Sequence, residues 1–98
     1  MIATPASVPV GMVTFNVRNA GVLGHELLVV RSNLSAAALP LSGNAVDEAA
    51  VQVVAQRKDI LSGGTASLAV DLAAGTYALL CNIPGHYQGG MHAAFTVR

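Results

Sequence analysis

Charge is scarce in this 98-residue chain: charged residues make up 10% of it, and five basic residues balance five acidic ones. A protein that binds nucleic acid or an anionic membrane surface usually carries a basic patch, so this balance argues against both kinds of partner. A content of 53% hydrophobic residues also excludes a disordered, charge-rich tail. The length suits one small domain and is too short for two. We therefore expect residues 1–98 to form a single domain. We also expect the protein to be a monomer.

Aromatic residues and cysteine are equally rare. Only 4% of the residues are aromatic and none is tryptophan, so the core must be built from valine, leucine and alanine. The single cysteine, Cys81, cannot form a disulfide within the chain. Small domains without disulfides are often stabilised by a bound metal, which makes Cys81 a candidate metal ligand.

Long apolar runs and leader-like features are also missing. No uninterrupted apolar stretch reaches the roughly 18 to 20 residues that a membrane helix needs, so we expect no membrane span. The segment Met1–Gly11 contains two prolines and no basic region, unlike a secretory signal peptide. We interpret the chain as a trimmed, mature form in which residues 1–10 are a loosely ordered N-terminal segment.

Strand-like patterns recur along the chain. Some segments alternate apolar and polar residues, as in a half-buried strand, and others are short apolar runs, as in a strand buried on both faces. We predict strands over Val13–Arg18, His25–Arg31, Thr65–Asp71, Thr76–Cys81 and Met91–Arg98. Five or six short strands with turns between them and little helix predict an all-β fold, either a β-sandwich or a barrel.

The pattern is weaker between residues 32 and 60. The segment Leu39–Asn44 is loop-like, and Asp47–Ala50 fits a single helical turn. A longer helix over Val46–Gln56 is an alternative, although four β-branched valines in that window lower its helix propensity.

Four residues with soft or imidazole donors form the main functional pattern. Cys81, His86 and Met91 are spaced as Cys-x4-His-x4-Met across the loop between the last two predicted strands. Because such a loop returns on itself, the three side chains can converge on one point. His25 opens another strand directly after the glycine-rich 19–24 turn, which can lie at the same end of an antiparallel sandwich. The spacing therefore permits one four-residue metal site.

The donor types favour copper. Two imidazoles, one thiolate and one thioether are the ligand set of blue-copper centres. Zinc rarely recruits methionine, and an iron–sulfur cluster needs more than one thiolate. A catalytic Cys–His pair would need a substrate cleft, for which a tight Pro-Gly loop leaves little room, so we expect no enzyme. His92 follows Met91 on an extended strand and should point to the other face, so we do not count it as a ligand.

Each candidate also has an ordinary structural interpretation. A lone cysteine after an apolar run is usually a small buried hydrophobic residue, and a methionine that opens a strand usually belongs to the core. The joint occurrence of Cys81, His86 and Met91 at this spacing, with His25 after a glycine-rich turn, favours the metal site over these separate explanations.

These motifs resemble those of the cupredoxins, the small blue copper proteins. Gly24-His25-Glu26 is similar to the azurin segment that carries the upstream histidine ligand, and Gly75-Thr76-Tyr77 resembles the tyrosine corner of plastocyanin. The spacing from Cys81 to Met91 resembles that of rusticyanin and sulfocyanin, and the loop sequence CNIPGHYQGGM resembles that of small bacterial copper-binding cupredoxins. The resemblance runs from about residue 11 to residue 98.

The resemblance implies a Greek-key β-sandwich of the cupredoxin type that holds one copper ion cycling between Cu(I) and Cu(II). Its ligands would be His25, Cys81, His86 and Met91. The implied function is one-electron transfer between redox partners in the periplasm or outside the cell. The alternative is a periplasmic copper-binding or copper-delivery protein, which the absence of a flanking Met- or His-rich tract disfavours. A domain of a multicopper oxidase is excluded by the length of the chain.

The resemblance also yields two local expectations. The redox partner should dock near His86, on an apolar patch formed by Val22, Leu23, Ile83, Pro84 and Tyr87. Glu26 and Asn82 stand where many cupredoxins have asparagine and serine or threonine. A carboxylate can accept a hydrogen bond from an amide, so we expect these two side chains to join the ligand-bearing strands.

Overall fold

A computed structural model describes residues 1–98, and almost every regular element in it is a β-strand. The elements follow one another in the order β1 (Ser7–Val8), β2 (Gly11–Arg18), β3 (His25–Arg31), β4 (Leu41–Ser42), β5 (Ala45–Val46), η1 (Glu48–Ala50), β6 (Gln52–Ile60), β7 (Thr65–Leu72), β8 (Gly75–Leu80) and β9 (His92–Val97). The one helical element is a three-residue turn, so the structure contains no helix that could span a bilayer. The prediction of an all-β chain is confirmed.

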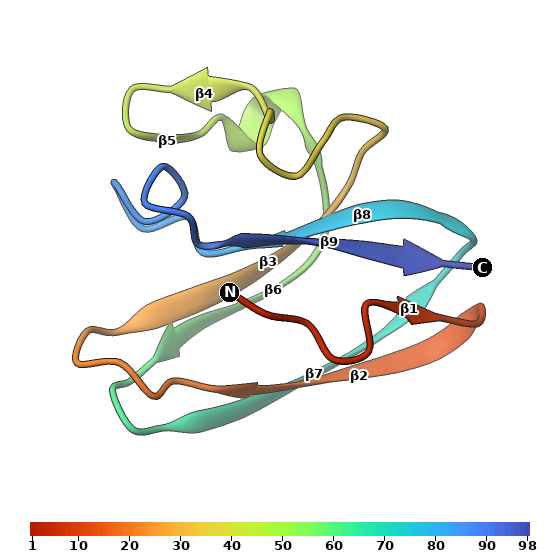
Figure 1. Cartoon of the computed structure of the whole chain (residues 1–98), viewed down its shortest axis with the longest axis horizontal. Helices are drawn as coiled ribbons and strands as arrows, with labels where there is room; N and C mark the ends of the chain where they lie inside the picture. Colours follow the sequence, from red (N-terminus) through yellow and green to blue (C-terminus); the bar gives the residue numbers. More distant parts are fainter.

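The strands form two facing sheets (Figure 1). The larger sheet has the order β1-β9-β8-β3-β6, the smaller consists of β2 and β7, and β4 and β5 form a separate hairpin. All of these pairs are antiparallel except β1 with β9. The chain crosses from the small sheet to the large one after β2, and returns to it only for β7. This connection makes the molecule a Greek-key sandwich.

The core between the sheets follows from residue alternation. In β2, Val13, Phe15 and Val17 face inward while the residues between them are exposed. Phe15 meets Phe95 of β9 edge to face, with ring centroids 5.1 Å apart. This first core is formed by Val13, Leu27, Val29, Ile60, Leu72, Tyr77, Leu79, Phe95 and Val97.

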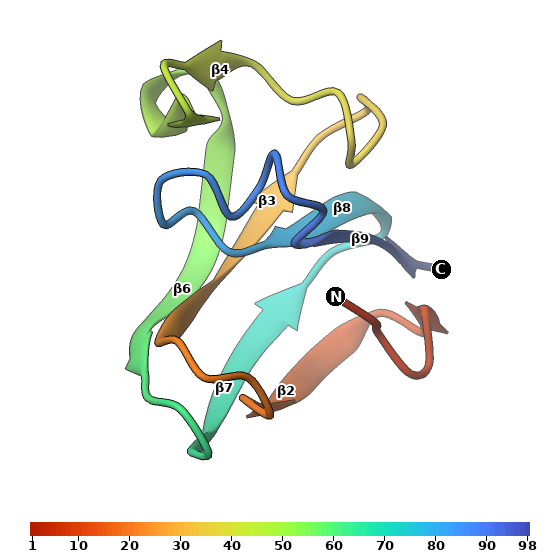
Figure 2. The ribbon, with the colours of Figure 1, turned by 60° about the vertical axis from the view of Figure 1, so that its left-hand side comes forward.

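A second core lies on the outer face of the large sheet. The predicted two-sided burial of β3 is confirmed, since Leu28 and Val30 point away from the first core and are fully buried. The segment from residue 32 to residue 51 covers this face and contributes Ala36, Leu39 and Val46. The loop of residues 82–91, which carries His86, lies next to the β4–β5 hairpin (Figure 2). The two are joined by a hydrogen bond from the Gly85 amide to the Asn44 carbonyl.

The alternative of a helix over Val46–Gln56 is wrong. The single turn is confirmed as η1, whose Asp47 side chain accepts a hydrogen bond from the Ala49 amide. The chain then enters β6 at Gln52 and pairs with β3. The valines in this stretch fit a strand, because Val53 packs on the second core and Val54 on the first.

Two further expectations concern the ends of strands. The Tyr77 hydroxyl donates a 2.7 Å hydrogen bond to the carbonyl of Ala73, which confirms the expected tyrosine corner. Within the N-terminal segment 1–10, Ser7–Val8 pairs in parallel with the end of β9. Part of this segment is therefore tied to the large sheet.

Candidate metal centre

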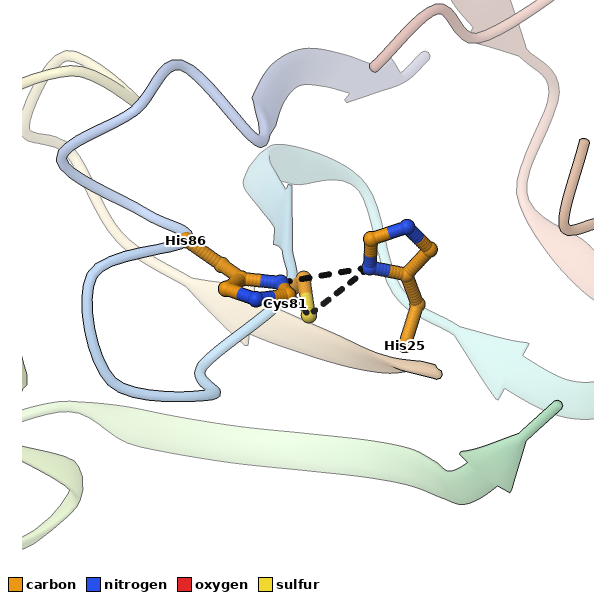
Figure 3. A group of neighbouring side chains, drawn as sticks. All are labelled: His25, Cys81 and His86. Atoms are coloured by element: carbon orange, nitrogen blue, oxygen red, sulfur yellow. Dashed lines mark hydrogen bonds between the residues drawn. The ribbon is translucent and has the colours of Figure 1, made fainter. Parts of the chain in front are cut away.

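Three of the four candidate ligands come together at one end of the sandwich. His25 is the first residue of β3, Cys81 directly follows β8, and His86 lies in the loop before β9. The two His Nδ1 atoms are 3.2 Å apart, and Cys81 Sγ lies 3.5 Å from Nδ1 of His86 and 3.8 Å from Nδ1 of His25. Figure 3 shows both imidazoles directed at the sulfur.

The three donor atoms form a triangle of the size that a metal ion requires. A triangle with these sides has its centre about 2 Å from each corner, which is close to metal–nitrogen and metal–sulfur bond lengths in proteins. Two imidazoles and one thiolate around a common centre are the three strong ligands of a blue-copper site. The residues present therefore fit one copper ion.

The environment of the donors favours their metal-binding forms. Burial, followed by the charge of the neighbouring His86, lowers the pKa of His25 below its ordinary value. A lower pKa favours the neutral imidazole, the form whose lone pair can bind a metal. Cys81 is fully buried, which shields its sulfur from solvent.

A backbone hydrogen bond links the Cys81 sulfur to the strand that carries His25. The amide of Glu26 donates to Cys81 Sγ at 3.3 Å. Hydrogen bonds to a ligand sulfur fix its orientation and tune the metal it binds. The link therefore joins β3 to the end of β8 at the metal centre.

The expected bond between the Glu26 and Asn82 side chains is wrong. Asn82 instead forms a pair of hydrogen bonds with the backbone of Val46 (2.7 and 3.0 Å) and donates to the Glu48 carboxylate at 2.9 Å. Asn82 points toward β5 and η1, the elements that cover the second core. It thus anchors the loop after Cys81 rather than the strand of His25.

The backbone of Met91 is hydrogen-bonded to the backbones of His86 and Cys81, two of the other three candidates. Its amide donates to the carbonyl of His86 and its carbonyl accepts from the amide of Cys81, both at 3.1 Å. Its half-buried side chain lines the same cavity as His25. His92, by contrast, is not part of the donor cluster, and its ring packs against Tyr87 with centroids 5.1 Å apart.

The loop that carries His86 is held by its own turns. Hydrogen bonds run from the His86 amide to Ile83, from Gly89 to Gly85 and from Gly90 to Tyr87. Gly85 and Gly90 have φ angles of 83° and 103°, which disfavour any residue with a side chain. The Gly85 amide also donates to Asn44 in the β4–β5 turn. The loop is therefore restrained from both sides.

The expected apolar patch around His86 is only partly correct. Val22 and Leu23 are 91% and 59% exposed, but Tyr87 is buried in the second core. Its hydroxyl donates to the Ala36 carbonyl and accepts from the Leu39 amide. A polar partner for the Tyr87 hydroxyl inside the core explains why a tyrosine is buried there.

Sequence reasoning missed one residue of this surface. Leu61 is 71% exposed and lies in the turn after β6, next to the 19–24 loop. The sequence contains a sign of this exposure, because Leu61 is a large apolar residue directly before the Ser62-Gly63-Gly64 turn. Exposed apolar residues therefore lie on two neighbouring loops at this end of the sandwich.

Comparison with known proteins agrees with this geometry. The sulfocyanin (SoxE) domain model matches residues 1–98, the whole chain. No curated protein matched the chain.

Among solved structures, dithionite-reduced auracyanin from the photosynthetic bacterium Roseiflexus castenholzii is 27% identical, with a TM-score of 0.71, and the match covers 94% of this chain and 82% of that one. Reduced rusticyanin is 25% identical with a TM-score of 0.67, and the match covers 94% of this chain but only 61% of that one. Both relatives are cupredoxins. The chain belongs to the sulfocyanin domain family of cupredoxins.

Proposed function

We propose that this protein is a one-electron carrier whose single copper ion is held by His25, Cys81, His86 and Met91. The observation that carries the proposal is the triangle of two imidazole nitrogens and one thiol sulfur, with sides of 3.2, 3.5 and 3.8 Å. A copper ion in such a site supplies the Cu(II)/Cu(I) couple. Auracyanin and rusticyanin, with which the chain shares its fold, were both solved in reduced form.

The role of the protein is to hold the donors still. Rapid electron transfer requires that the ligands keep nearly one arrangement in both oxidation states. Cys81 is fully buried at the end of a central strand, and its sulfur accepts the Glu26 amide. Hydrogen bonds that join the 82–91 loop to Asn44 and Val46 restrain the segment that carries His86 and Met91. Met91 would complete the set with its thioether, a weak soft donor that would help to set the reduction potential.

The partner would be a redox protein that docks near His86. Pro84 is exposed and His86 half-buried, and Val22, Leu23 and Leu61 add exposed apolar surface at the same end of the sandwich. Because the net charge is zero, long-range steering of the partner would be weak. We place the protein in the periplasm or outside the cell, as a monomer, in line with the cupredoxin resemblance.

Copper retention during reduction tests this proposal against copper delivery. The copper-loaded protein is reduced at neutral pH in the presence of a modest excess of bathocuproine disulfonate, a Cu(I) chelator, and is also studied by voltammetry at an electrode. We expect copper to stay bound and electron exchange to be fast and reversible, because thiolate and thioether suit Cu(I) while imidazole also suits Cu(II). His92→Ala, outside the donor cluster, serves as the control and should behave like wild type. Prompt loss of copper with sluggish exchange would indicate delivery instead.

A further inference from the structure

Asn19 is a buried polar residue in a loop whose neighbouring residues are exposed. It directly follows β2 and is only 3% exposed. Its side-chain amide donates to the carbonyls of Leu23 and Ile60 at 2.7 and 2.9 Å, and its side-chain oxygen accepts from the Gly21 amide at 3.0 Å. One side chain therefore closes the 19–24 loop on itself and fastens it to the end of β6.

The backbone extends this connection to the turn after β6. The backbone amide of Asn19 donates to the Gly64 carbonyl at 2.9 Å, and the backbone carbonyl of Asn19 accepts from the Gly63 amide at 2.8 Å. The Ser62 hydroxyl donates to the carbonyl of Gly21. Figure 1 shows the two loops together at the end of the sandwich where β3 begins. Ile60 is also the residue that pairs with His25 across β3 and β6.

Gly21 places this loop directly against the imidazole of His25. A Cβ atom added to Gly21 would lie 3.3 Å from Nε2 of His25, closer than most side-chain contacts. The φ angle of Gly21 is one that any residue can adopt, so the tight spacing rather than the backbone favours glycine here. Nε2 is the second nitrogen of the imidazole ring, and the first, Nδ1, lies 3.8 Å from the Cys81 sulfur.

We propose that Asn19 is a positioning residue for His25. It fixes the 19–24 loop so that Gly21 borders Nε2 and the ring keeps Nδ1 directed at Cys81. This inference rests on the proposed function, in which His25 is a copper ligand. Metal-binding histidines are usually oriented by a partner of the second ring nitrogen. Here the hydrogen bonds of Asn19 hold the 19–24 loop in a conformation that orients the ring.

A pair of glycine variants tests the contact without removing any hydrogen bond. Gly21→Ala places a methyl group 3.3 Å from His25 Nε2 and 3.4 Å from Asn19 Oδ1, whereas at Gly24 an added Cβ would have no neighbour nearer than 3.9 Å beyond its two adjacent residues. We expect Gly21→Ala to change the copper hyperfine splitting in the electron paramagnetic resonance spectrum, and Gly24→Ala to leave it as in wild type. Identical spectra for Gly21→Ala and wild type would overturn the proposal.

A pair of asparagine variants tests the hydrogen bonds themselves. Asn19→Ala should weaken copper affinity about ten- to a hundred-fold, as loss of a residue that orients a metal ligand typically does. Asn16→Ala removes an exposed asparagine of β2 whose side chain accepts a hydrogen bond from the Ser67 hydroxyl, and should leave the affinity unchanged. Equal affinity in the two variants would also overturn the proposal. If Asn19→Ala does not fold, the glycine pair decides.

The metal-free protein separates this inference from the proposed function. The imidazole nitrogen and proton resonances of His25 report the surroundings of the ring without copper. They should shift in Gly21→Ala and remain in place in Gly24→Ala. If wild type binds no copper, the proposed function fails, while these resonances still decide whether the loop positions the ring.

Discussion

Cys81→Ser is expected to abolish the intense visible absorption of the copper-loaded protein completely. That absorption arises from charge transfer from a thiolate to copper, and a hydroxyl cannot supply it. Cys81 is the only thiol in the chain, and its sulfur is the corner of the donor triangle shared by both histidines. The measurement is the visible spectrum of equal amounts of wild-type and variant protein after one equivalent of Cu(II).

His92→Ala is the matched control for this experiment. His92 lies one residue from Met91 and packs on Tyr87, but it is outside the donor cluster. The control should retain the full absorption of wild type. A coloured Cys81→Ser protein would show that the sulfur is not a ligand, and a colourless His92→Ala protein would show that the assigned set is incomplete.

Copper is expected to raise the melting temperature of wild type strongly and that of His25→Ala much less. A metal that binds only the folded chain stabilises it by mass action, by about 4 kcal/mol when its free concentration is a thousand times the dissociation constant. For a domain of this size that corresponds to a shift of roughly 20 °C. His25 supplies one of the three clustered donor atoms. Its removal would therefore leave copper with one strong ligand fewer and lower the affinity.

Thermal unfolding of each protein, with and without copper, measures this effect. His92→Ala again serves as the control and should show the full shift. The metal-free melting temperatures of both variants must be measured as well, because His25 contacts His86 at 3.2 Å even without metal. Equal copper-dependent shifts in wild type and His25→Ala would exclude His25 from the site.

The sequence was most informative where local pattern and local chemistry agree. The long apolar run of β3 predicted a strand buried on both faces, and Leu27–Val30 are buried. Cys81, His86 and Met91 are close in sequence, so a returning loop had to bring them near each other. His25 is distant in sequence, but it opens a strand after a glycine-rich turn at the same end of the sandwich, and its Nδ1 lies 3.8 Å from the Cys81 sulfur.

The sequence was least informative where long-range packing decides. β6 carries the valines that also allowed a helix, and its pairing with β3 selects the strand. Tyr87 was expected at the surface because it lies in a loop, but the segment 32–51 folds over it and supplies partners for its hydroxyl. The side-chain partner of Asn82 is likewise on η1, more than thirty residues away. None of these contacts has a local signature.

Titration of the metal-free protein with Cu(II), followed by visible and electron paramagnetic resonance spectroscopy, tests the central claim most directly. Two histidines and one buried cysteine around a single centre predict saturation at one copper per chain. They also predict an intense thiolate-to-copper absorption and the small hyperfine splitting of a blue-copper site. A protein that stays colourless under oxidising conditions, with all four residues intact, would contradict the assignment of a blue-copper electron carrier.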